Sequence, residues 1–270
     1  PTVQLNGQYI SPVQARKVKV RDFPGGVRAE FMIGETKVTT EIMPVIHAVG
    51  DPAWRGAALY RVSTDPPAPV KLLCGGSMAA TMWGRQHWLR QEGQLTAKDD
   101  QVEMLQDGMA MLDSPAYPLS VAVHTPGRMK KAAEPEGGEY LEITFPHGSG
   151  NIMMGFSQQA DDAKALARTG ADEAIAEVQA HYDELFKNRI DTPENVLDEA
   201  FQSALVTLEY TYRYPYGWME CIHHWLSMWH MQAGGCARYI GQTDRAWNCL
   251  WSNAENLTPE GGVPNLGPGG

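Results

Sequence analysis

Residues 214 to 235 bring together five aromatic side chains, three histidines and a single carboxylic acid. Flat aromatic rings stack on the apolar C–H faces of sugars, and a few fixed polar groups then bind the sugar hydroxyls. This combination predicts that the segment contacts a carbohydrate. The predicted contact residues are Tyr214, Tyr216, Trp218, His223 and His224.

Glu220 is the acid of this segment and the candidate catalytic residue. Hydrolysis of a glycosidic bond needs two carboxyl groups, about 5 Å apart for retention of configuration or about 6.5 to 9.5 Å apart for inversion, one of them protonated. Asp244 and Glu260 are weaker candidates for such a group. An acid at the start of a helix also interacts favourably with the helix dipole, so a structural role for Glu220 is the alternative.

A second cluster of polar and aromatic residues lies at residues 83 to 88, with the sequence WGRQHW. On a strand, Trp83, Arg85 and His87 would point to the same side because side chains alternate. We assign Trp83 and Arg85 as further candidates for sugar contact. A structural role at a domain interface is the alternative, and both interpretations stay open.

Glu220, His223 and His230 would share one face of a helix, which raises the question of a metal site. Zinc hydrolases carry H-E-x-x-H or H-x-x-E-H, and the sequence ECIHH from Glu220 matches neither. The three side chains would be spread along about 15 Å of one helix and could not converge on an ion. We therefore predict no metal. The sequence also shows no phosphate-binding loop or dinucleotide fingerprint, so no cofactor is predicted.

The composition argues against several classes of partner. The 270 residues carry a formal net charge of -10 and a pI near 5.3, with no dense run of Lys and Arg, which argues against binding to nucleic acid. No run approaches the roughly 20 apolar residues of a membrane span, and the first residues lack the pattern of a signal peptide. The compartment stays open, with a secreted or periplasmic location slightly preferred to a cytoplasmic one. A neutral carbohydrate is the expected partner.

The four cysteines form no C-x-x-C pair, so the sequence does not indicate redox or zinc chemistry. We expect buried thiols at all four positions, with one disulfide among the last three as the alternative. The positions are Cys74, Cys221, Cys236 and Cys249.

Residues 1 to 157 are predicted to form an antiparallel β-sandwich. From Lys17 to Phe156 the apolar residues come in short runs rich in β-branched types, which Gly, Pro and Asp separate. Such spacing, without helical patterns in between, is typical of a sandwich. Residues 64 to 70 and 124 to 139 are predicted to be exposed loops.

After Phe156 the period of the apolar residues changes to that of a helix. Residues 158 to 190 are predicted to form linker helices, and residues 191 to 270 are predicted to form helical hairpins. We expect three helices in the hairpin region. An aromatic loop at residues 214 to 218 connects the first helix to the second. The first is capped by Thr192, the second runs from about Met219 to a stop at Gly234 and Gly235, and the third is capped by Thr243.

This order of elements resembles the six-hairpin (α/α) glycosidase superfamily, which includes glucoamylase-like, trehalase-like and glycogen-debranching-like enzymes. The residue pattern that supports the resemblance is TPE…LDEAF…AL…L from Thr192, followed by the aromatic loop, so it is confined to about residues 190 to 235. The resemblance implies an α+β fold, with a β-sandwich preceding a barrel of twelve helices. It also implies hydrolysis of an oligo- or polysaccharide by acid and base carboxylates, and sugar contacts at Tyr216, Trp218 and Glu220.

The chain is too short for that barrel. Only 80 residues follow Ile190, whereas twelve helices of about 11 residues with connections of about 4 to 6 need on the order of 180. We therefore expect an incomplete (α/α)6 barrel from a fragment of a longer enzyme. The resemblance also implies that catalytic carboxylates come from later hairpins, as is usual in that superfamily. Apolar surface left open on the helices predicts self-association. A non-catalytic carbohydrate-binding or interaction module is the alternative function.

Overall fold

The computed structural model describes residues 2–5, 8–10, 16–45, 55–75, 100–113, 119–133, 138–213, 217–218 and 228–262. Contacts divide these residues into two units, which meet between Val178 and Gln179. That division falls inside the predicted linker at 158 to 190, so the linker residues are shared between the units. The boundaries predicted at 157 and 190 stay a prediction.

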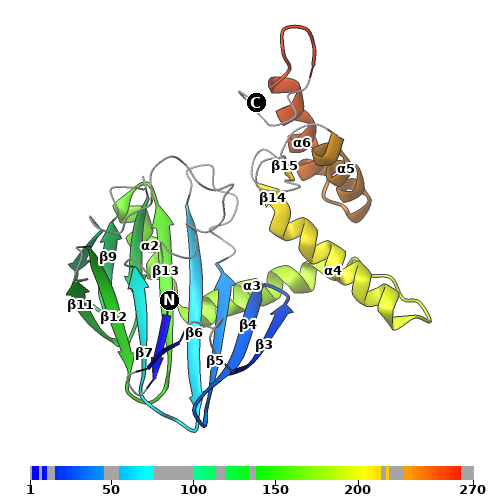
Figure 1. The fold of residues 1–270 in the computed structure, drawn as a ribbon. Coiled ribbons are helices and arrows are strands. Elements are labelled where there is room, and N and C mark those ends of the chain that lie inside the picture. The colour runs from blue at the N-terminus through cyan, green and yellow to red at the C-terminus, as the bar shows by residue number, and fades with distance from the viewer. Residues whose placement is uncertain are drawn as a thin grey trace. The chain divides into compact units, whose positions relative to one another are not determined.

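The first unit contains two antiparallel sheets (Figure 1). The larger sheet has eight strands in the order β3 (Arg16–Phe23), β4 (Gly26–Ile33), β5 (Thr36–Pro44), β6 (Gly56–Asp65), β13 (Ser149–Ser157), β10 (Ser120–His124), β9 (Met109–Asp113) and β8 (Gln101–Met104). The smaller sheet has five strands in the order β11 (Arg128–Ala133), β12 (Glu139–Phe145), β7 (Val70–Gly75), β1 (Thr2–Leu5) and β2 (Gln8–Ile10). The predicted sandwich is therefore confirmed.

Alternating side chains from the two sheets form the main core. On β12, Leu141, Ile143 and Phe145 are buried while the residues between them are partly exposed, as the two-residue period of a strand requires. They pack in one cluster with residues of the larger sheet such as Phe31 and Ile152. The predicted loop at 64 to 70 is confirmed for residues 66 to 69, but Thr64 and Asp65 belong to β6 and Val70 begins β7. The predicted loop at 124 to 139 contains strand β11.

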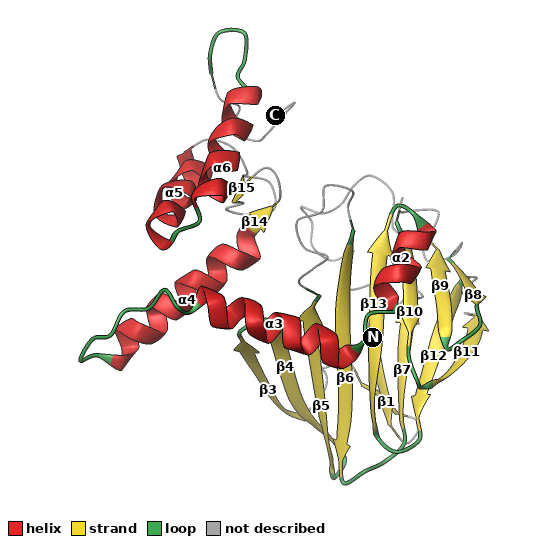
Figure 2. Cartoon of the chain, turned by 180° about the vertical axis from the view of Figure 1, so that it is seen from behind, coloured by secondary structure: helices red, strands yellow, loops and turns green. Residues whose placement is uncertain are grey.

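The larger sheet is also covered on its other face (Figure 2). Helix α2 (Ala160–Ala167) packs Ala163 and Ala167 against Met109, Met111 and Ala122. The first turns of α3 (Ala171–Leu185) pack Ala174 in a cluster with Met43, Leu59 and Met153. Small alanine side chains on the helices let them approach the sheet closely, so this face is an extension of the core.

Gly155 on β13 permits the closest approach between α2 and the sheet. A Cβ atom at this position would lie 2.1 Å from the carbonyl oxygen of Ala163 and 2.8 Å from the backbone nitrogen of Ala167. Both neighbours are backbone atoms, which cannot rotate away as a side chain can. Gly155 is therefore required by packing.

We predict that Gly155→Ala lowers the free energy of unfolding of the first unit by about 1 to 3 kcal/mol, because the helix must shift off the sheet. Gly56→Ala is the matched control, since Gly56 lies on the neighbouring strand β6 and nothing lies within 4 Å of its added Cβ. Urea unfolding followed by circular dichroism measures both. Equal stability of the two variants would contradict the packing assigned to Gly155.

The second unit consists of helices and one short hairpin of strands. Its elements after the end of α3 are α4 (Asn195–Thr211), β14 (Tyr212–Arg213), β15 (Gly217–Trp218), α5 (Met228–Ala237), the 3-10 helix η4 (Arg238–Ile240) and α6 (Thr243–Glu255). Together with the sandwich, they confirm the predicted α+β class. Within the described ranges, no helix combines the length and the apolar character needed to cross a membrane.

Helix α4 begins later than predicted, and Thr192 is not its cap. The Thr192 hydroxyl donates a hydrogen bond to Asp198 Oδ1 at 2.9 Å and accepts one from the Glu194 backbone nitrogen at 3.2 Å. Glu194 is the N-cap residue, without a side-chain capping bond. Thr192 therefore stabilises the turn that precedes the helix. Thr243 is likewise the first residue of α6 and not its cap, which is Gln242.

Helix α5 continues through Gly234 and Gly235, where the sequence predicted a stop. A Cβ atom at Gly234 would lie 3.2 Å from Cys249 Sγ on α6. The glycine therefore serves close packing of two helices, and the prediction of a helix end was wrong for that reason. The predicted beginning of this helix, residues 219 to 227, lies outside the described residues.

Candidate functional site

The aromatic segment predicted to bind sugar begins in a short antiparallel hairpin of the second unit. Tyr212 pairs with Trp218 and Arg213 pairs with Gly217, so residues 214 to 216 connect the two strands. Gly217 has a φ of 117°, which a residue with a side chain rarely adopts. The hairpin joins directly to the C-terminal end of α4, since Thr211 is the last residue of the helix.

Trp218 is buried in this hairpin, with only 2% of its surface exposed. Its indole Nε1–H donates a hydrogen bond of 2.9 Å to the carbonyl oxygen of Leu208, near the end of α4. The ring packs in one cluster with Ala237 and Cys249 from α5 and α6. This position explains Trp218 as a packing residue that fixes the hairpin on the helices. Its contact with a sugar stays a prediction.

Tyr212 extends this cluster toward the charged residues of α6. Its ring lies edge-on to Trp218, with the two centroids 4.9 Å apart. The Arg245 guanidinium carbon lies 4.6 Å from the Tyr212 ring centroid, and Asn248 Nδ2 donates a hydrogen bond of 3.0 Å to the Tyr212 hydroxyl. The cation–π contact and the hydrogen bond fix the orientation of the ring. One face of the hairpin is thereby attached to α6.

Glu209, near the end of α4, is the centre of a polar network. Its carboxylate accepts hydrogen bonds from Arg245 Nη1 at 2.5 Å and Nη2 at 3.2 Å, and from Gln242 Nε2 at 2.9 Å. His181 Nε2 on α3 lies 3.0 Å from the same carboxylate. The Glu209 side chain is 9% exposed. A single acid therefore connects α3, α4 and α6 within the second unit.

Glu209 is held in its ionised form. Burial by itself raises the pKa of a carboxyl group, but the hydrogen bonds from His181 and Arg245 and the charge of Arg245 lower the pKa of Glu209 to about 2. A carboxylate with so low a pKa cannot donate a proton near neutral pH. The arrangement is that of a structural ion pair and does not fit a general acid.

We predict that the second unit loses stability in acid because of this group. The pKa of Glu209 is lower when folded, about 2 against the ordinary 4.5, so its stabilising effect is complete above pH 4.5 and is lost as the pH falls toward 2. Because protonation of Glu209 is coupled to unfolding, the free energy of unfolding should fall by on the order of 3 kcal/mol. Hydrogen exchange of the second unit between pH 6 and pH 2.5 measures it. The stability of the Glu209→Gln variant should depend less on pH than that of the unchanged protein. The same pH dependence in both proteins would refute the role assigned to the Glu209 ion pair.

Of the predicted site residues, Trp218 is the one that the structure describes. The others lie outside the described residues, so their roles stay predictions: Glu220, Tyr214, Tyr216, His223, His224, Trp83 and Arg85. Among the weaker acidic candidates, Asp244 is an exposed residue in the first turn of α6 and Glu260 lies in an exposed turn. Both side chains therefore lie in contact with solvent.

Within the described ranges, no group of three or more His, Cys, Asp and Glu side chains is arranged so that it could hold a metal ion. Glu220 and His223 lie outside those ranges, and the side chain of His230 is not described. The absence of a metal therefore stays a prediction.

The cysteines depart from expectation at one position. Cys74 and Cys249 are buried, as predicted, but Cys236 is exposed on α5, and none of these three forms a disulfide. Burial raises the pKa of Cys249 to about 12, although hydrogen bonds from the backbone N–H groups of Trp218 and Gly234 lower it. Burial also raises the pKa of Cys74. Both buried thiols stay protonated at neutral pH, so neither is a nucleophile.

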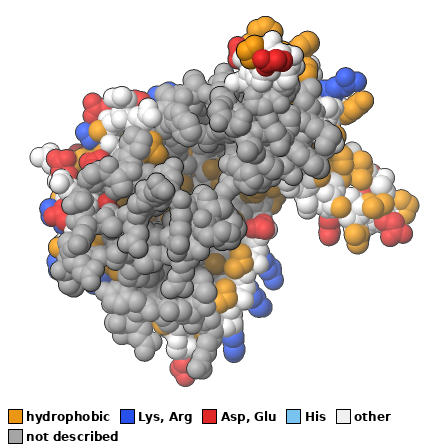
Figure 3. Space-filling model, turned by 45° about the horizontal axis from the view of Figure 1, so that its top comes forward, with side chains coloured by type: hydrophobic (Ala, Val, Ile, Leu, Met, Phe, Trp, Pro, Cys, Tyr) orange, Lys and Arg blue, Asp and Glu red, His pale blue; other side chains and the backbone are white. Residues whose placement is uncertain are grey.

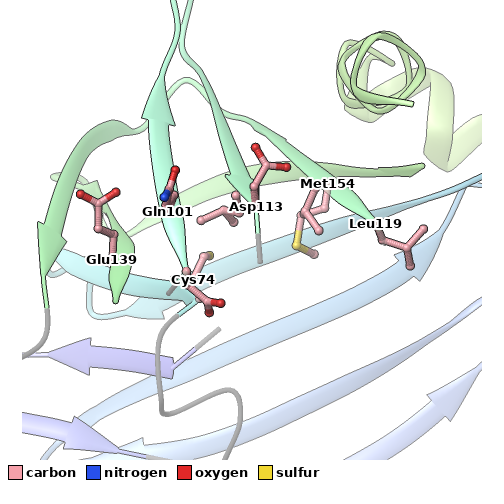
Figure 4. Close-up of a pocket in the computed structure, with 10 residues that line it drawn as sticks. Cys74, Gln101, Asp113, Leu119, Glu139 and Met154 are labelled. Atoms are coloured by element: carbon pink, nitrogen blue, oxygen red, sulfur yellow. The ribbon is translucent and has the colours of Figure 1, made fainter. Parts of the chain in front are cut away.

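A cavity of about 310 Å³ lies in the first unit, at the end of the sandwich where β7 ends and β8 and β12 begin (Figure 4). Its walls come from both sheets. The apolar part of the lining consists of Cys74, Leu112, Leu119, Val121 and Met154. The polar part consists of Asp100, Gln101, Asp113 and Glu139. No sequence pattern pointed to this cavity, because its residues are scattered over 80 positions of the chain.

Among the described acids that line this cavity, Glu139 is the one that forms an ion pair. Its Oε1 forms an ion pair of 2.8 Å with Lys131 Nζ, and its Oε2 accepts a hydrogen bond of 2.7 Å from the Val102 backbone nitrogen. The Lys131 ammonium and the Val102 N–H lower the pKa of Glu139. Asp100 differs, because its Oδ1 is enclosed and has no hydrogen-bond partner in the described structure.

Large apolar side chains are exposed on the helices of the second unit. Val196 and Leu197 at the start of α4 are exposed, and Figure 3 shows hydrophobic side chains at the surface over this helix. On α6, Trp247 and Trp251 are 63% and 64% exposed, one turn apart. The opposite face of α6 is buried through Ala246 and Cys249. This helix therefore has two apolar faces, of which one is covered.

Comparison with known proteins supports the fold. No family model matches the sequence, and no curated protein matches it. Among solved structures, the chain is similar to one from the human microbiome that has been assigned as a kojibiose phosphorylase, with a TM-score of 0.58 and 9% sequence identity. The similarity covers 95% of this chain and 38% of the other, so this chain spans well under half of that protein's length. At this identity the similarity concerns the fold, a sandwich followed by helices, and not the activity.

The network around Glu209 was missed by the sequence analysis. Its partners His181, Gln242 and Arg245 lie 28 to 36 residues away along the chain, so no local spacing connects them. One signal was present. Glu209 follows Leu205 by four residues, which places an acid on the buried face of α4. A buried acid requires partners, and that requirement could have predicted an ion pair.

Proposed function

We propose that this chain is a carbohydrate-active protein of the six-hairpin (α/α) glycosidase superfamily and takes part in cleaving a glycosidic bond. The observation that supports the proposal is the fold, since a sandwich followed by helical hairpins is shared with the assigned kojibiose phosphorylase over 95% of this chain. The order of elements and the aromatic hairpin at residues 212 to 218 fit the same superfamily. The substrate would be an oligo- or polysaccharide.

In this proposal, the aromatic loop that follows α4 contacts the sugar. Tyr214 and Tyr216 would stack on sugar rings, and His223 and His224 would bind hydroxyl groups. Trp218 would act mainly by fixing the loop, because its own ring is buried. Trp83 and Arg85 stay as additional sequence-based candidates for sugar contact.

Glu220 is proposed as the general acid, with the second carboxyl group supplied by a later hairpin of a longer chain. A general acid must be protonated in the free enzyme, which requires a raised pKa. Glu209 fails this requirement because its pKa is about 2. Among acids near the hairpin, Glu220 is therefore the one to test.

The bond could be cleaved by water or by phosphate, since the general acid protonates the leaving oxygen in both reactions. Water as the attacking group gives two free sugars, whereas phosphate gives one free sugar and one sugar phosphate. Incubation of a longer chain that includes the later hairpins with kojibiose, with and without inorganic phosphate, distinguishes these outcomes by mass spectrometry of the products. We expect cleavage that Glu220→Gln abolishes while sugar binding persists.

Binding of a saccharide without cleavage would instead favour the alternative, a non-catalytic carbohydrate-binding or interaction module. Absence of both binding and cleavage would contradict the proposal. The exposed apolar residues of α4 and α6 add an expected partner, either further helices of a longer chain or a second copy. Sedimentation velocity tests the second copy, because a monomer at all concentrations would exclude it.

A further inference from the structure

We propose that the cavity at the end of the sandwich binds a small organic ammonium ion with an aliphatic body. This site lies wholly in the first unit, whereas the aromatic hairpin at residues 212 to 218 belongs to the second unit. Its volume of about 310 Å³ is at the lower end of the range for small-molecule sites. A short alkyl chain with one charged end is a ligand of suitable size.

The apolar part of the lining determines the body of the ligand. Leu112, Leu119, Val121 and Met154 are only partly buried and line the cavity, so an apolar ligand would remove their remaining surface from water. A sugar would place hydroxyl groups against these side chains, where they find no partners. Burying unpaired hydroxyl groups is unfavourable, so this lining selects an aliphatic body over a sugar.

The charged part of the lining determines the other end of the ligand. Asp100, Asp113 and Glu139 are acids, and no Lys, Arg or His is among the described lining residues. Figure 4 shows Asp113 and Glu139 on different strands at the cavity. Lys131 neutralises Glu139, but no ion pair with Asp100 or Asp113 is formed within the described part of the chain. Within the described residues, Asp100 and Asp113 therefore have no cationic partner beside the cavity.

Asp100 is the strongest reason for a cationic ligand. One oxygen of its carboxylate is enclosed and accepts no hydrogen bond, and no described residue forms an ion pair with this carboxylate. The Asp100 backbone is fixed, because its carbonyl oxygen accepts a hydrogen bond of 2.9 Å from the Glu139 nitrogen. A cation in the cavity would compensate the charge of a carboxylate that is already held in place. A neutral ligand would not.

The test is calorimetric titration of the whole chain with hexylammonium chloride, compared with 1-hexanol and methyl α-glucoside. We expect saturable binding of one hexylammonium ion, at least tenfold tighter than hexanol, with no binding of the glucoside at this site. Butylammonium should bind roughly fourfold more weakly for each methylene that it lacks. Equal binding of hexanol and hexylammonium would overturn the proposal, and so would competition between the glucoside and hexylammonium.

Variants locate the binding site. Asp100→Asn keeps the shape of the side chain but removes its charge, and we expect it to weaken hexylammonium binding on the order of tenfold. Asp113→Asn is the second variant, because this exposed residue tolerates change even if Asp100→Asn should fold poorly. Glu35→Gln removes a charge from an exposed turn that does not line the cavity, and it should leave the affinity unchanged. The same small effect from all three variants would mean non-specific attraction to an acidic protein and would refute the site.

Discussion

Trp218→Ala should lower the free energy of unfolding of the second unit by about 3 to 5 kcal/mol, the usual effect of removing a large buried aromatic side chain. The indole fills the space between the hairpin and helices α5 and α6, and its N–H satisfies the carbonyl oxygen of Leu208. Both contributions disappear with the side chain. Urea unfolding followed by tryptophan fluorescence and by hydrogen exchange of residues 205 to 253 measures the loss.

Trp247→Ala is the matched control for this prediction, because it removes the same kind of side chain from the same unit. Trp247 lies on the exposed face of α6, so its loss should change the stability by less than about 1 kcal/mol. Trp218→Phe retains an aromatic ring but loses the hydrogen bond to Leu208, and its stability should be intermediate. If Trp218→Ala and Trp247→Ala were equally stable and only the first lost sugar binding, Trp218 would be a binding residue and not a packing residue.

Glu209→Gln should have the second-largest effect, a loss of about 2 to 4 kcal/mol in the stability of the second unit. The substitution leaves Arg245 without its charge partner in a site where the arginine side chain is largely covered. It also replaces one acceptor oxygen by an amide NH2 group, which donates hydrogen bonds but cannot accept them. Breaking a buried ion pair on one side is costly because the remaining charge is desolvated and unpaired.

Glu184→Gln provides the control, because Glu184 pairs with Lys187 at the end of α3 and both side chains are more than two-thirds exposed. Exposed pairs of this kind contribute about 0 to 1 kcal/mol. A double-mutant cycle with Glu209→Gln and Arg245→Met should give a coupling energy well above the value for Glu184 and Lys187. Equal coupling in the two pairs would show that the Glu209 network does not hold the helices together.

Much of the fold was predictable because each unit repeats a simple period. Strands such as β12 alternate buried and exposed residues, and α3 places Ala174, Val178 and Tyr182 on one buried face, as expected for the helices predicted at residues 158 to 190. Strand β11 was missed because it is an edge strand with exposed charged residues, including Lys130 and Lys131. Its backbone pairs with β12 while its side chains show no apolar period.

The candidate site was less predictable because an aromatic residue serves packing and binding equally well. Trp218 follows Pro215 and Gly217, which indicated a loop, but its partners come from α5 and α6 and cannot be inferred from nearby residues. Gly234 was misjudged, since a glycine that ends a helix and one that admits a neighbouring helix look alike in sequence. The burial of Trp218 and the continuation of α5 both depend on tertiary contacts, which the local pattern does not contain.

The most direct test of the proposed function is sugar binding by the intact protein. Saturation-transfer NMR with kojibiose and longer gluco-oligosaccharides should show saturable binding, and Tyr216→Ala should weaken it by about tenfold through the loss of ring stacking. Tyr239→Ala removes a tyrosine that is exposed on η4, and it should leave binding unchanged. If no saccharide binds the folded protein, or if the two tyrosine variants bind equally well, then the carbohydrate function assigned to the aromatic hairpin is wrong.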